Sequence, residues 1–147
     1  MVGRADKMLA GLKRAGLKLT PQRIAIVREL ADDLSHPTAQ ALFERLRPAY
    51  PTMSFATVYS TLDVLVDHGL AGSLNADEGS RAVRFDPNVE PHHHAICDTC
   101  GTVIDIPRVD REVAAPAAHD VEGFRVLREE RTYRGLCHHC LARPPRT

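Results

Sequence analysis

The sequence predicts an α+β fold built from two small units, a helical N-terminal one and a strand-rich C-terminal one. Apolar residues recur at the helical period as far as Gly69, and the period then changes to short strand-like runs. A segment with two prolines and no periodicity, residues 86–91, follows as a hinge. With 147 residues, 44% of them hydrophobic, the chain is long enough for two small cores.

The first two helices have clear start and stop signals. A helix with Leu9 and Leu12 on one face should end at Gly16, which suits a left-handed C-terminal cap. The next helix should begin with Thr20 as its N-cap and Pro21 in the first helical position, where no backbone N–H is needed. Its expected buried stripe is Ile24, Val27, Leu30 and Ala31.

Two further helices are expected before Gly69. Thr38 can cap the third, which Pro48 and Pro51 end, and Ser54 can cap the fourth, which should stop at Gly69. The stripes expected to face inward are Leu42, Phe43 and Leu46 in the third helix and Val58, Leu62, Leu65 and Val66 in the fourth. The opposite face of the fourth helix carries Tyr59, Ser60 and Asp63.

A hairpin follows the helices. Residues 70–74 and 81–85 are the expected strands, and a polar turn joins them. Helices followed by a hairpin outline a winged helix-turn-helix, whose late helix enters the DNA major groove, although small helical domains with a hairpin also occur without DNA binding. Residues 1–30 hold seven basic and two acidic side chains, so a chain with no net charge can still present a basic face.

The second unit has short expected strands and few large hydrophobic residues. The strands are residues 95–97, 102–106 and 124–133, with a weak helical stretch at 109–119. A unit of about 60 residues usually needs a metal or a partner subunit for stability. We place the two domains at residues 1–86 and 87–147.

The cysteines predict a metal site in a reducing compartment. No apolar run approaches the roughly 18 residues that span a bilayer, and charges interrupt the first 20 residues, so we expect a cytoplasmic protein with no membrane partner. All cysteines fall in two C-x-x-C pairs 36 residues apart: Cys97, Cys100, Cys137 and Cys140. Four thiolates suit a closed structural Zn²⁺ site, and a redox dithiol or disulfides are the alternatives.

A second candidate cluster is the run His92-His93-His94. On an extended segment His92 and His94 share one face, and they could chelate one ion. The alternative is a polar histidine run on an exposed edge. Further candidate ligands lie at the hinge, after the next expected strand and in a turn of the first unit: Asp86, Asp105 and His36.

Four stretches that follow the length of the chain resemble the ferric uptake regulator (Fur) family: Leu17-Lys18-Leu19-Thr20-Pro21-Gln22-Arg23, His36-Pro37-Thr38-Ala39, Ala56-Thr57-Val58-Tyr59, and His92-His93-His94-Ala95-Ile96-Cys97-Asp98-Thr99-Cys100-Gly101 through Asp105. The resemblance implies a dimeric bacterial transcription factor with an N-terminal winged helix and a C-terminal α/β dimerisation domain. It also implies a structural zinc and a regulatory metal at the hinge.

Carried over from the family, the structural zinc ligands are Cys97, Cys100, Cys137 and Cys140, and the regulatory ligands are His36, Asp86, His92, His94 and Asp105. Aspartate at both carboxylate positions resembles the peroxide-responsive regulators (PerR), whereas iron-uptake regulators tend to have glutamate there. Such nitrogen and oxygen ligands suit Fe²⁺ and Mn²⁺ as well as Zn²⁺, which can occupy the site in a purified sample. A third site of some iron-type relatives corresponds to His93, Glu112 and Glu129, and only Glu112 matches directly.

The resemblance implies a metal-dependent repressor that binds double-stranded operator DNA as a homodimer. In the peroxide-responsive branch, bound Fe²⁺ reduces hydrogen peroxide, and a ligand histidine, here His36 or His92, is oxidised. Such self-oxidation occurs once and is not catalytic turnover, so we do not expect the protein to be an enzyme. The alternative within the family is an iron-, manganese- or zinc-responsive repressor without peroxide sensing. Two alternatives lie outside it: a metal-dependent hydrolase, for which the sequence offers no separate general base, and an interaction module stabilised by zinc.

DNA contacts are expected on the fourth helix and at the start of the second. Tyr59 could pack against thymine methyl groups, and Thr57 and Ser60 could reach base edges or phosphates. Iron-type relatives often have arginine at the position of Ser60. Lys18 and Arg23 are candidate groove or phosphate contacts, or else a solvated basic helix end.

Overall fold

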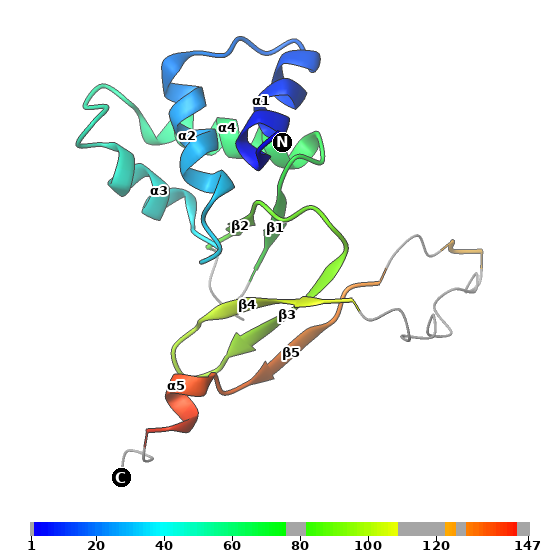
Figure 1. The fold of residues 1–147 in the computed structure, drawn as a ribbon. Helices are drawn as coiled ribbons and strands as arrows, with labels where there is room; N and C mark the ends of the chain where they lie inside the picture. Colours follow the sequence, from blue (N-terminus) through cyan, green and yellow to red (C-terminus); the bar gives the residue numbers. More distant parts are fainter. Residues whose placement is uncertain (1, 76–81, 109–122, 126–128, 144–147) are drawn as a thin grey trace. The chain divides into compact units, whose positions relative to one another are not determined.

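The computed structural model describes residues 2–75, 82–108, 123–125 and 129–143 of the chain (Figure 1). It divides into two compact units, Met1–Val89 and Glu90–Thr147, and each is described by itself. The first unit contains α1 (Arg4–Arg14), α2 (Pro21–Ala31), α3 (Ala39–Leu46), α4 (Phe55–Asp67), β1 (Gly72–Leu74) and β2 (Arg84–Asp86). The second contains β3 (His92–Cys97), β4 (Val103–Pro107), β5 (Thr132–Gly135) and α5 (His138–Leu141). The α+β prediction is confirmed.

Side-chain caps start α2, α3 and α4 as the sequence predicts. The hydroxyls of Thr20, Thr38 and Ser54 accept hydrogen bonds from backbone amides three residues later, at 3.1 to 3.2 Å. Gly16 and Gly69, which follow α1 and α4, have φ angles of 82° and 67°. A side chain there would be strained, so both glycines serve as the expected helix stops.

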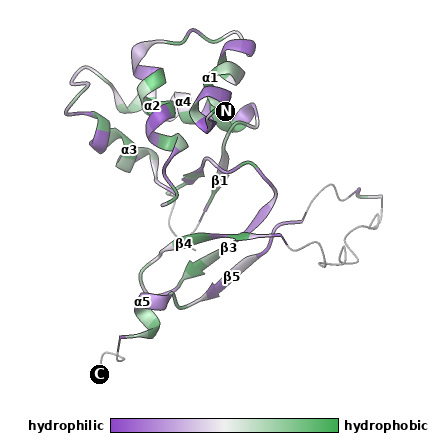
Figure 2. Cartoon of the chain, in the orientation of Figure 1, coloured by the Kyte–Doolittle hydropathy of each residue, from purple (hydrophilic) through white to green (hydrophobic). Residues whose placement is uncertain are grey.

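The core of the first unit lies between its four helices, whose amphipathic character is visible in the hydropathy colouring of Figure 2. The predicted stripe of α2 is partly wrong, because Ile26 is buried whereas Ile24 is only half-buried. The reason is that α2 contacts α1, α3 and α4, so it buries more than one face. In α1 the buried pair is Met8 and Leu12, and the predicted Leu9 packs at the margin of the core.

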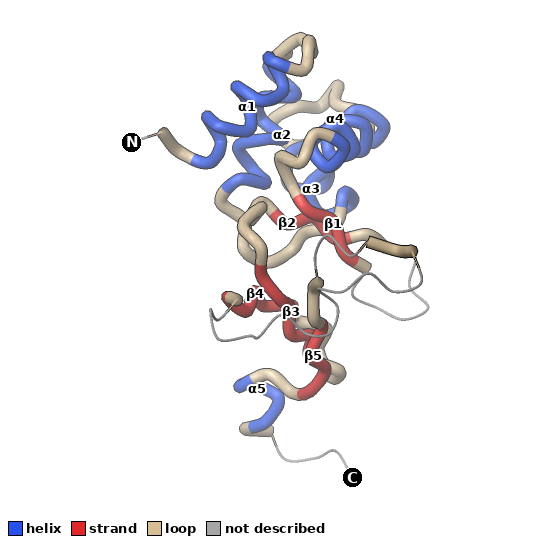
Figure 3. The backbone as a smooth tube through the Cα atoms, turned by 90° about the vertical axis from the view of Figure 1, so that its right-hand side faces the viewer, coloured by secondary structure: helices blue, strands red, loops and turns tan. Residues whose placement is uncertain are grey.

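The wing of the first unit is an antiparallel pair of short strands, drawn red in Figure 3. Its register sets Gly72 opposite Asp86 and Leu74 opposite Arg84. β1 begins later than the predicted 70–74, since the amides of Leu70 and Ala71 donate to the Leu65 carbonyl at the end of α4. β2 runs one residue beyond the predicted 81–85, to Asp86, which was assigned to the hinge. Most of the predicted turn lies outside the described residues.

The second unit is a three-stranded sheet with the order β4-β3-β5. β3 pairs antiparallel with β4 and parallel with β5. Of the predicted strand 124–133, Thr132 and Tyr133 belong to β5, which begins opposite His94 and extends beyond the prediction to Gly135, whereas residues 126–128 lie outside the described residues. The amide of the preceding Arg131 donates to the ring Nδ1 of His93. The helix expected at 109–119 lies outside the described residues, and α5 was not expected from the sequence.

Among the described residues, no helix combines the length and the apolar character that a membrane span requires.

A matched pair of leucines tests this account of the core. Leu42 is fully buried in α3, whereas Leu34 is 67% exposed. We expect Leu42→Ala to lower the free energy of unfolding by about 2 to 5 kcal/mol, because it loses apolar burial and leaves a cavity. Leu34→Ala should change it by less than about 0.5 kcal/mol. Urea titrations followed by circular dichroism measure both, and equal effects would contradict the assignment of the core.

Candidate metal centres

Four thiols converge within the second unit. Cys97 is the last residue of β3, and Cys100 lies in the turn that follows. Cys137 is the N-cap of α5, and Cys140 lies within that helix. All four sulfurs lie within 4.8 Å of one another, and Cys100 Sγ is 3.6 Å from Cys137 Sγ. Sulfurs at 2.3 Å from one tetrahedral Zn²⁺ are about 3.8 Å apart. The cluster therefore has the dimensions of a four-thiolate zinc site.

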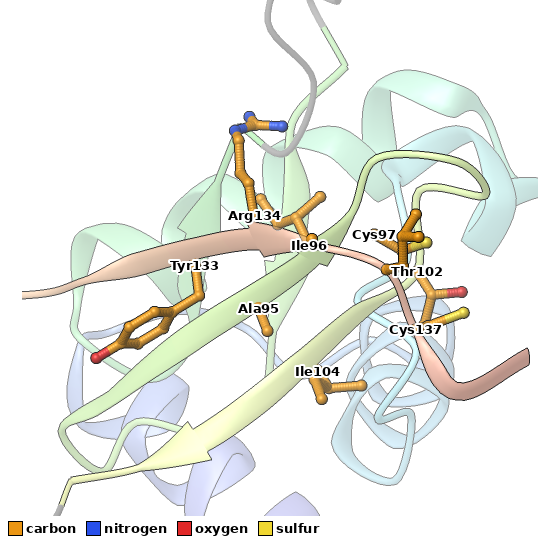
Figure 4. Close-up of a pocket in the computed structure, with 10 residues that line it drawn as sticks. Ala95, Ile96, Cys97, Thr102, Ile104, Tyr133, Arg134 and Cys137 are labelled. Carbon is orange, nitrogen blue, oxygen red and sulfur yellow. The ribbon is translucent and has the colours of Figure 1, made fainter. Parts of the chain in front are cut away.

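Backbone hydrogen bonds hold the two C-x-x-C loops together. The amide of Asp98 donates to the Gly135 carbonyl at 2.8 Å, which joins the first loop to the strand end that leads into the second. The first loop closes with the amide of Gly101 donating to the Cys97 carbonyl at 2.9 Å. Gly101 has φ 75°, a conformation that favours glycine. An apolar hollow of about 150 Å³ lies beside the cluster. Figure 4 shows Cys97, Cys137 and Thr102 at one end of this hollow and Tyr133 at the other.

The thiols of this cluster do not ionise equally. Backbone amides of Cys137 and Cys100 lower the pKa of Cys97 to about 6. Burial, and then hydrogen bonding to the neighbouring thiols, raises the pKa of Cys140 to about 12. A bound dication would supply positive charge that favours the thiolate forms.

The first unit contributes one histidine and one aspartate that face each other. His36 Nε2 lies 3.3 Å from Asp86 Oδ2, and both side chains are almost fully buried. The other oxygen of Asp86 accepts a hydrogen bond from the Asn88 amide at 2.9 Å, which fixes the carboxylate. One imidazole and one buried carboxylate at this spacing can bind a single cation.

The turn that carries His36 is strained and is held by the wing. His36 has φ 57°, which is uncommon for a residue with a side chain. Arg84 donates from Nη1 to the His36 carbonyl at 3.1 Å, and the Phe85 amide donates to the Pro37 carbonyl at 2.9 Å. Strand β2 thus supports the turn and presents Asp86 to it. The supporting role of Arg84 was not predicted, although its position two residues before Asp86 on a strand was the available signal.

The second unit gathers three more candidate ligands. His92 and His94 lie on one face of β3, with their Nε2 atoms 3.0 Å apart. Asp105 on β4 is paired with His94, and its Oδ1 lies 3.2 Å from His92 Nε2 and 3.4 Å from His94 Nε2. The Nδ1 atom of His92 contacts the Glu90 carbonyl, which directs Nε2 toward Asp105. Two imidazole nitrogens and a carboxylate oxygen therefore converge as potential ligands.

His93 lies on the opposite face of β3. It is 1% exposed, and its Nδ1 accepts a hydrogen bond from the Arg131 amide at 2.9 Å, so this nitrogen carries no proton. Of the other residues considered for a third site, Glu129 forms an ion pair with Arg131 at 2.7 Å, and Glu112 lies outside the described residues.

The candidate DNA contacts lie together on the first unit. Tyr59 is 41% exposed on α4, Ser60 is also exposed, and Thr57 is half-buried. Arg23 and Ser60 line the same small hollow, and Arg23 donates to the Lys18 carbonyl at 2.8 Å. The start of α2 and the outward face of α4 are therefore adjacent.

Comparison with known proteins places the chain in a family. The model of the ferric uptake regulator family matches residues 14–132. The peroxide-responsive repressor PerR of Staphylococcus epidermidis is 39% identical over 137 residues, which are 92% of this chain and 89% of the relative. The peroxide operon regulator of Bacillus subtilis is 40% identical over 134 residues, 90% of each chain. A solved structure, GAS PerR-Zn-Zn, matches with a TM-score of 0.55 and 30% identity, over 98% of this chain and 91% of that one. The chain belongs to the ferric uptake regulator family.

Proposed function

We propose that the protein is a metal-dependent transcriptional repressor that binds operator DNA as a homodimer and releases it when hydrogen peroxide oxidises a ligand histidine. The observation that carries the proposal is the pairing of histidine nitrogens with aspartate, His36 with Asp86 and His92 and His94 with Asp105. The relatives from Staphylococcus epidermidis and Bacillus subtilis are a peroxide-responsive repressor and a peroxide operon regulator. Such a repressor acts in the cytoplasm, where the DNA is.

The four thiols are proposed to hold a structural Zn²⁺. Cys97, Cys100, Cys137 and Cys140 fill all four positions of a tetrahedral ion and leave none for a substrate. The ion would join the end of β3 to α5. Among the described residues of the second unit, the buried apolar side chains are only Ile96, Cys97 and Val103. The zinc would therefore supply stability that this small core lacks.

The regulatory ion is proposed to be Fe²⁺ or Mn²⁺, bound by ligands from both units: His36, Asp86, His92, His94 and Asp105. Three imidazoles and two carboxylates suit either ion, and also Zn²⁺ in a purified sample. An ion that bound both sets of ligands would fix one arrangement of the DNA-binding unit relative to the second unit. Because it binds that arrangement better than others, it would raise the population able to bind DNA.

Fe²⁺ at this site would reduce hydrogen peroxide, and the oxidant formed would add oxygen to a ligand imidazole. The candidates are His36, the histidine ligand from the first unit, and His92. An oxidised ring would be a weaker ligand, so the link between the units would be lost and the DNA released. Each protein molecule would be oxidised once and would not return to its starting state, so the oxidation would be regulation without enzymatic turnover.

Contacts to DNA are assigned to the outward face of α4 and the start of α2. Tyr59, Thr57 and Ser60 would face the major groove, and Lys18 and Arg23 would contact phosphates or a groove edge. The adjacency of Arg23 and Ser60 supports one continuous surface.

Loss of one thiol tests the structural zinc. We expect Cys97→Ser to lose zinc and to unfold the second unit, because the remaining ligands cannot neutralise and hold the ion as four thiolates do. Elemental analysis and size-exclusion chromatography with light scattering measure zinc content and dimerisation. Thr99→Ser, in the same loop, is the control and should keep both. A folded, zinc-free dimer of Cys97→Ser would refute the assignment.

Two histidine variants test the regulatory ion. His94→Ala should lower Mn²⁺ affinity at least about 100-fold, because it removes a direct ligand. His36→Asn tolerates the left-handed backbone and removes the imidazole, so the protein should stay folded. It should keep part of the Mn²⁺ affinity through the other four ligands, yet lose most of the metal-dependent DNA affinity, because Asp86 would be the one ligand left to bind the ion from the first unit.

Titration calorimetry and fluorescence anisotropy with labelled duplex measure these two affinities. His68→Asn, an exposed histidine of the first unit, is the control and should leave both unchanged. If His36→Asn binds DNA like the unaltered protein, His36 does not connect the metal to DNA binding.

Peroxide sensing is tested by the position of the added oxygen. Treatment of the Fe²⁺-loaded protein with hydrogen peroxide should add one oxygen to the peptide that contains His36 or His92. The Mn²⁺-loaded protein should be protected, since peroxide oxidises Mn²⁺ far less readily. Peptide mass spectrometry makes the measurement. Oxygen only on cysteines, or equally with both metals, would favour a metal-responsive repressor without peroxide sensing.

A further inference from the structure

Three aromatic side chains form a row on the first unit. Phe43 of α3 meets Phe55 of α4 with ring centroids 5.9 Å apart and an interplanar angle of 82°. Phe55 in turn lies 6.1 Å from Tyr59 on the same helix. Phe55 and Tyr59 are each 41% exposed. Tyr59 is an expected DNA contact, whereas the sequence indicates no role for Phe55.

Phe55 is held in place from two sides. The edge-to-face contact with Phe43 fixes its ring, and Tyr59, four residues later, covers the next turn of the helix. The Phe43 ring in turn has the guanidinium of Arg47 5.9 Å from its centre. The exposed part of Phe55 is therefore a preformed apolar contact with little mobility to lose on binding.

The position of Phe55 favours DNA as its partner. It is the first residue of α4, and the N-terminal residues of a recognition helix contact base edges in the major groove. The first acidic residue of α4 is Asp63, eight positions later and about 12 Å along the axis. No carboxylate of the first two turns would repel phosphates, and the positive end of the helix dipole attracts them.

The groups beside Phe55 match a base edge better than a protein surface. Its polar neighbours in the first turns are Ser54, Thr57 and Ser60, which are hydroxyl groups that suit bases and phosphates. The apolar feature of a major-groove edge is the 5-methyl group of thymine, which phenylalanine can contact. An aromatic ring within a polar surface of this kind is suited to distinguish thymine from cytosine.

We propose that Phe55 is a specificity-determining residue that packs against a thymine methyl group in the operator, beside the contact assigned to Tyr59. This inference rests on the proposed function, because it requires metal-dependent DNA binding. Phe43 acts as the positioning residue for the Phe55 ring.

The test removes the methyl group and the ring separately. A duplex is selected from a random pool by the Mn²⁺-loaded full-length protein, and each thymine is then replaced in turn by deoxyuridine, which lacks only the methyl group. At the position that Phe55 reads, the unaltered protein should lose affinity about fourfold, as expected for one buried methyl group. Phe55→Ala should bind the thymine duplex several-fold more weakly and bind both duplexes equally.

Further variants separate this role from folding. Phe55→Leu retains an apolar side chain against Phe43, so it should keep the fold and part of the discrimination. Leu34→Ala removes an exposed apolar side chain elsewhere on the same unit and should discriminate as the unaltered protein does. Tyr59→Ala should remain sensitive to the thymine that Phe55 reads.

Each contrary result has a distinct meaning. If Mn²⁺-loaded protein selects no duplex, the proposed function is overturned and the inference with it. If a duplex is selected but Phe55→Ala still prefers every thymine over deoxyuridine, the role of Phe55 alone is overturned. A change in dimer mass in Phe55→Ala, or in the salt dependence of DNA binding, would likewise overturn it, by indicating a protein interface or a phosphate contact.

Discussion

The proposed regulation depends on two close pairings of aspartate with histidine, Asp86 with His36 and Asp105 with His92 and His94. In each pairing, a strand places the aspartate beside the histidine nitrogens. Asp86 reaches His36 because the end of β2 lies beside the turn that precedes α3, where the Arg84 side chain and the Phe85 amide bind its carbonyls. Asp105 reaches His92 and His94 because the register of β3 with β4 sets it directly opposite His94. In both units, backbone pairing decides which side chains can share an ion.

The second unit depends on its thiols for more than metal binding. Its described part buries few apolar side chains, while four sulfurs from its two ends lie within 4.8 Å of one another. A closed four-thiolate site would remove the cysteines from peroxide chemistry and hold the sheet that orients His92 and His94. The structural ion would therefore stabilise the second unit, and the regulatory ion would respond to peroxide.

Local signals were sufficient for most of the first unit, and long-range contacts explain what sequence analysis missed. The caps Thr20, Thr38 and Ser54 and the stops Gly16 and Gly69 act within a few residues, so the sequence displays them directly. The start of β5 depends on the Arg131 amide and the His93 ring, which are 38 positions apart. The convergence of the cysteines was predictable from spacing, and that of His92, His94 and Asp105 from strand alternation and the family resemblance. The support that Arg84 gives to His36 required the structure, since the two are 48 positions apart.

The central claim is that one regulatory ion couples to DNA binding, and reciprocal linkage tests it most directly. Mn²⁺ affinity would be measured by titration calorimetry with the free protein and with the protein bound to its selected duplex. Thermodynamic linkage requires that DNA raise the affinity for Mn²⁺ by the same factor by which Mn²⁺ raises the affinity for DNA. We expect both factors to lie well above tenfold, within the usual range of coupling free energies of about 1 to 3 kcal/mol. Equal Mn²⁺ affinities with and without DNA would contradict the account.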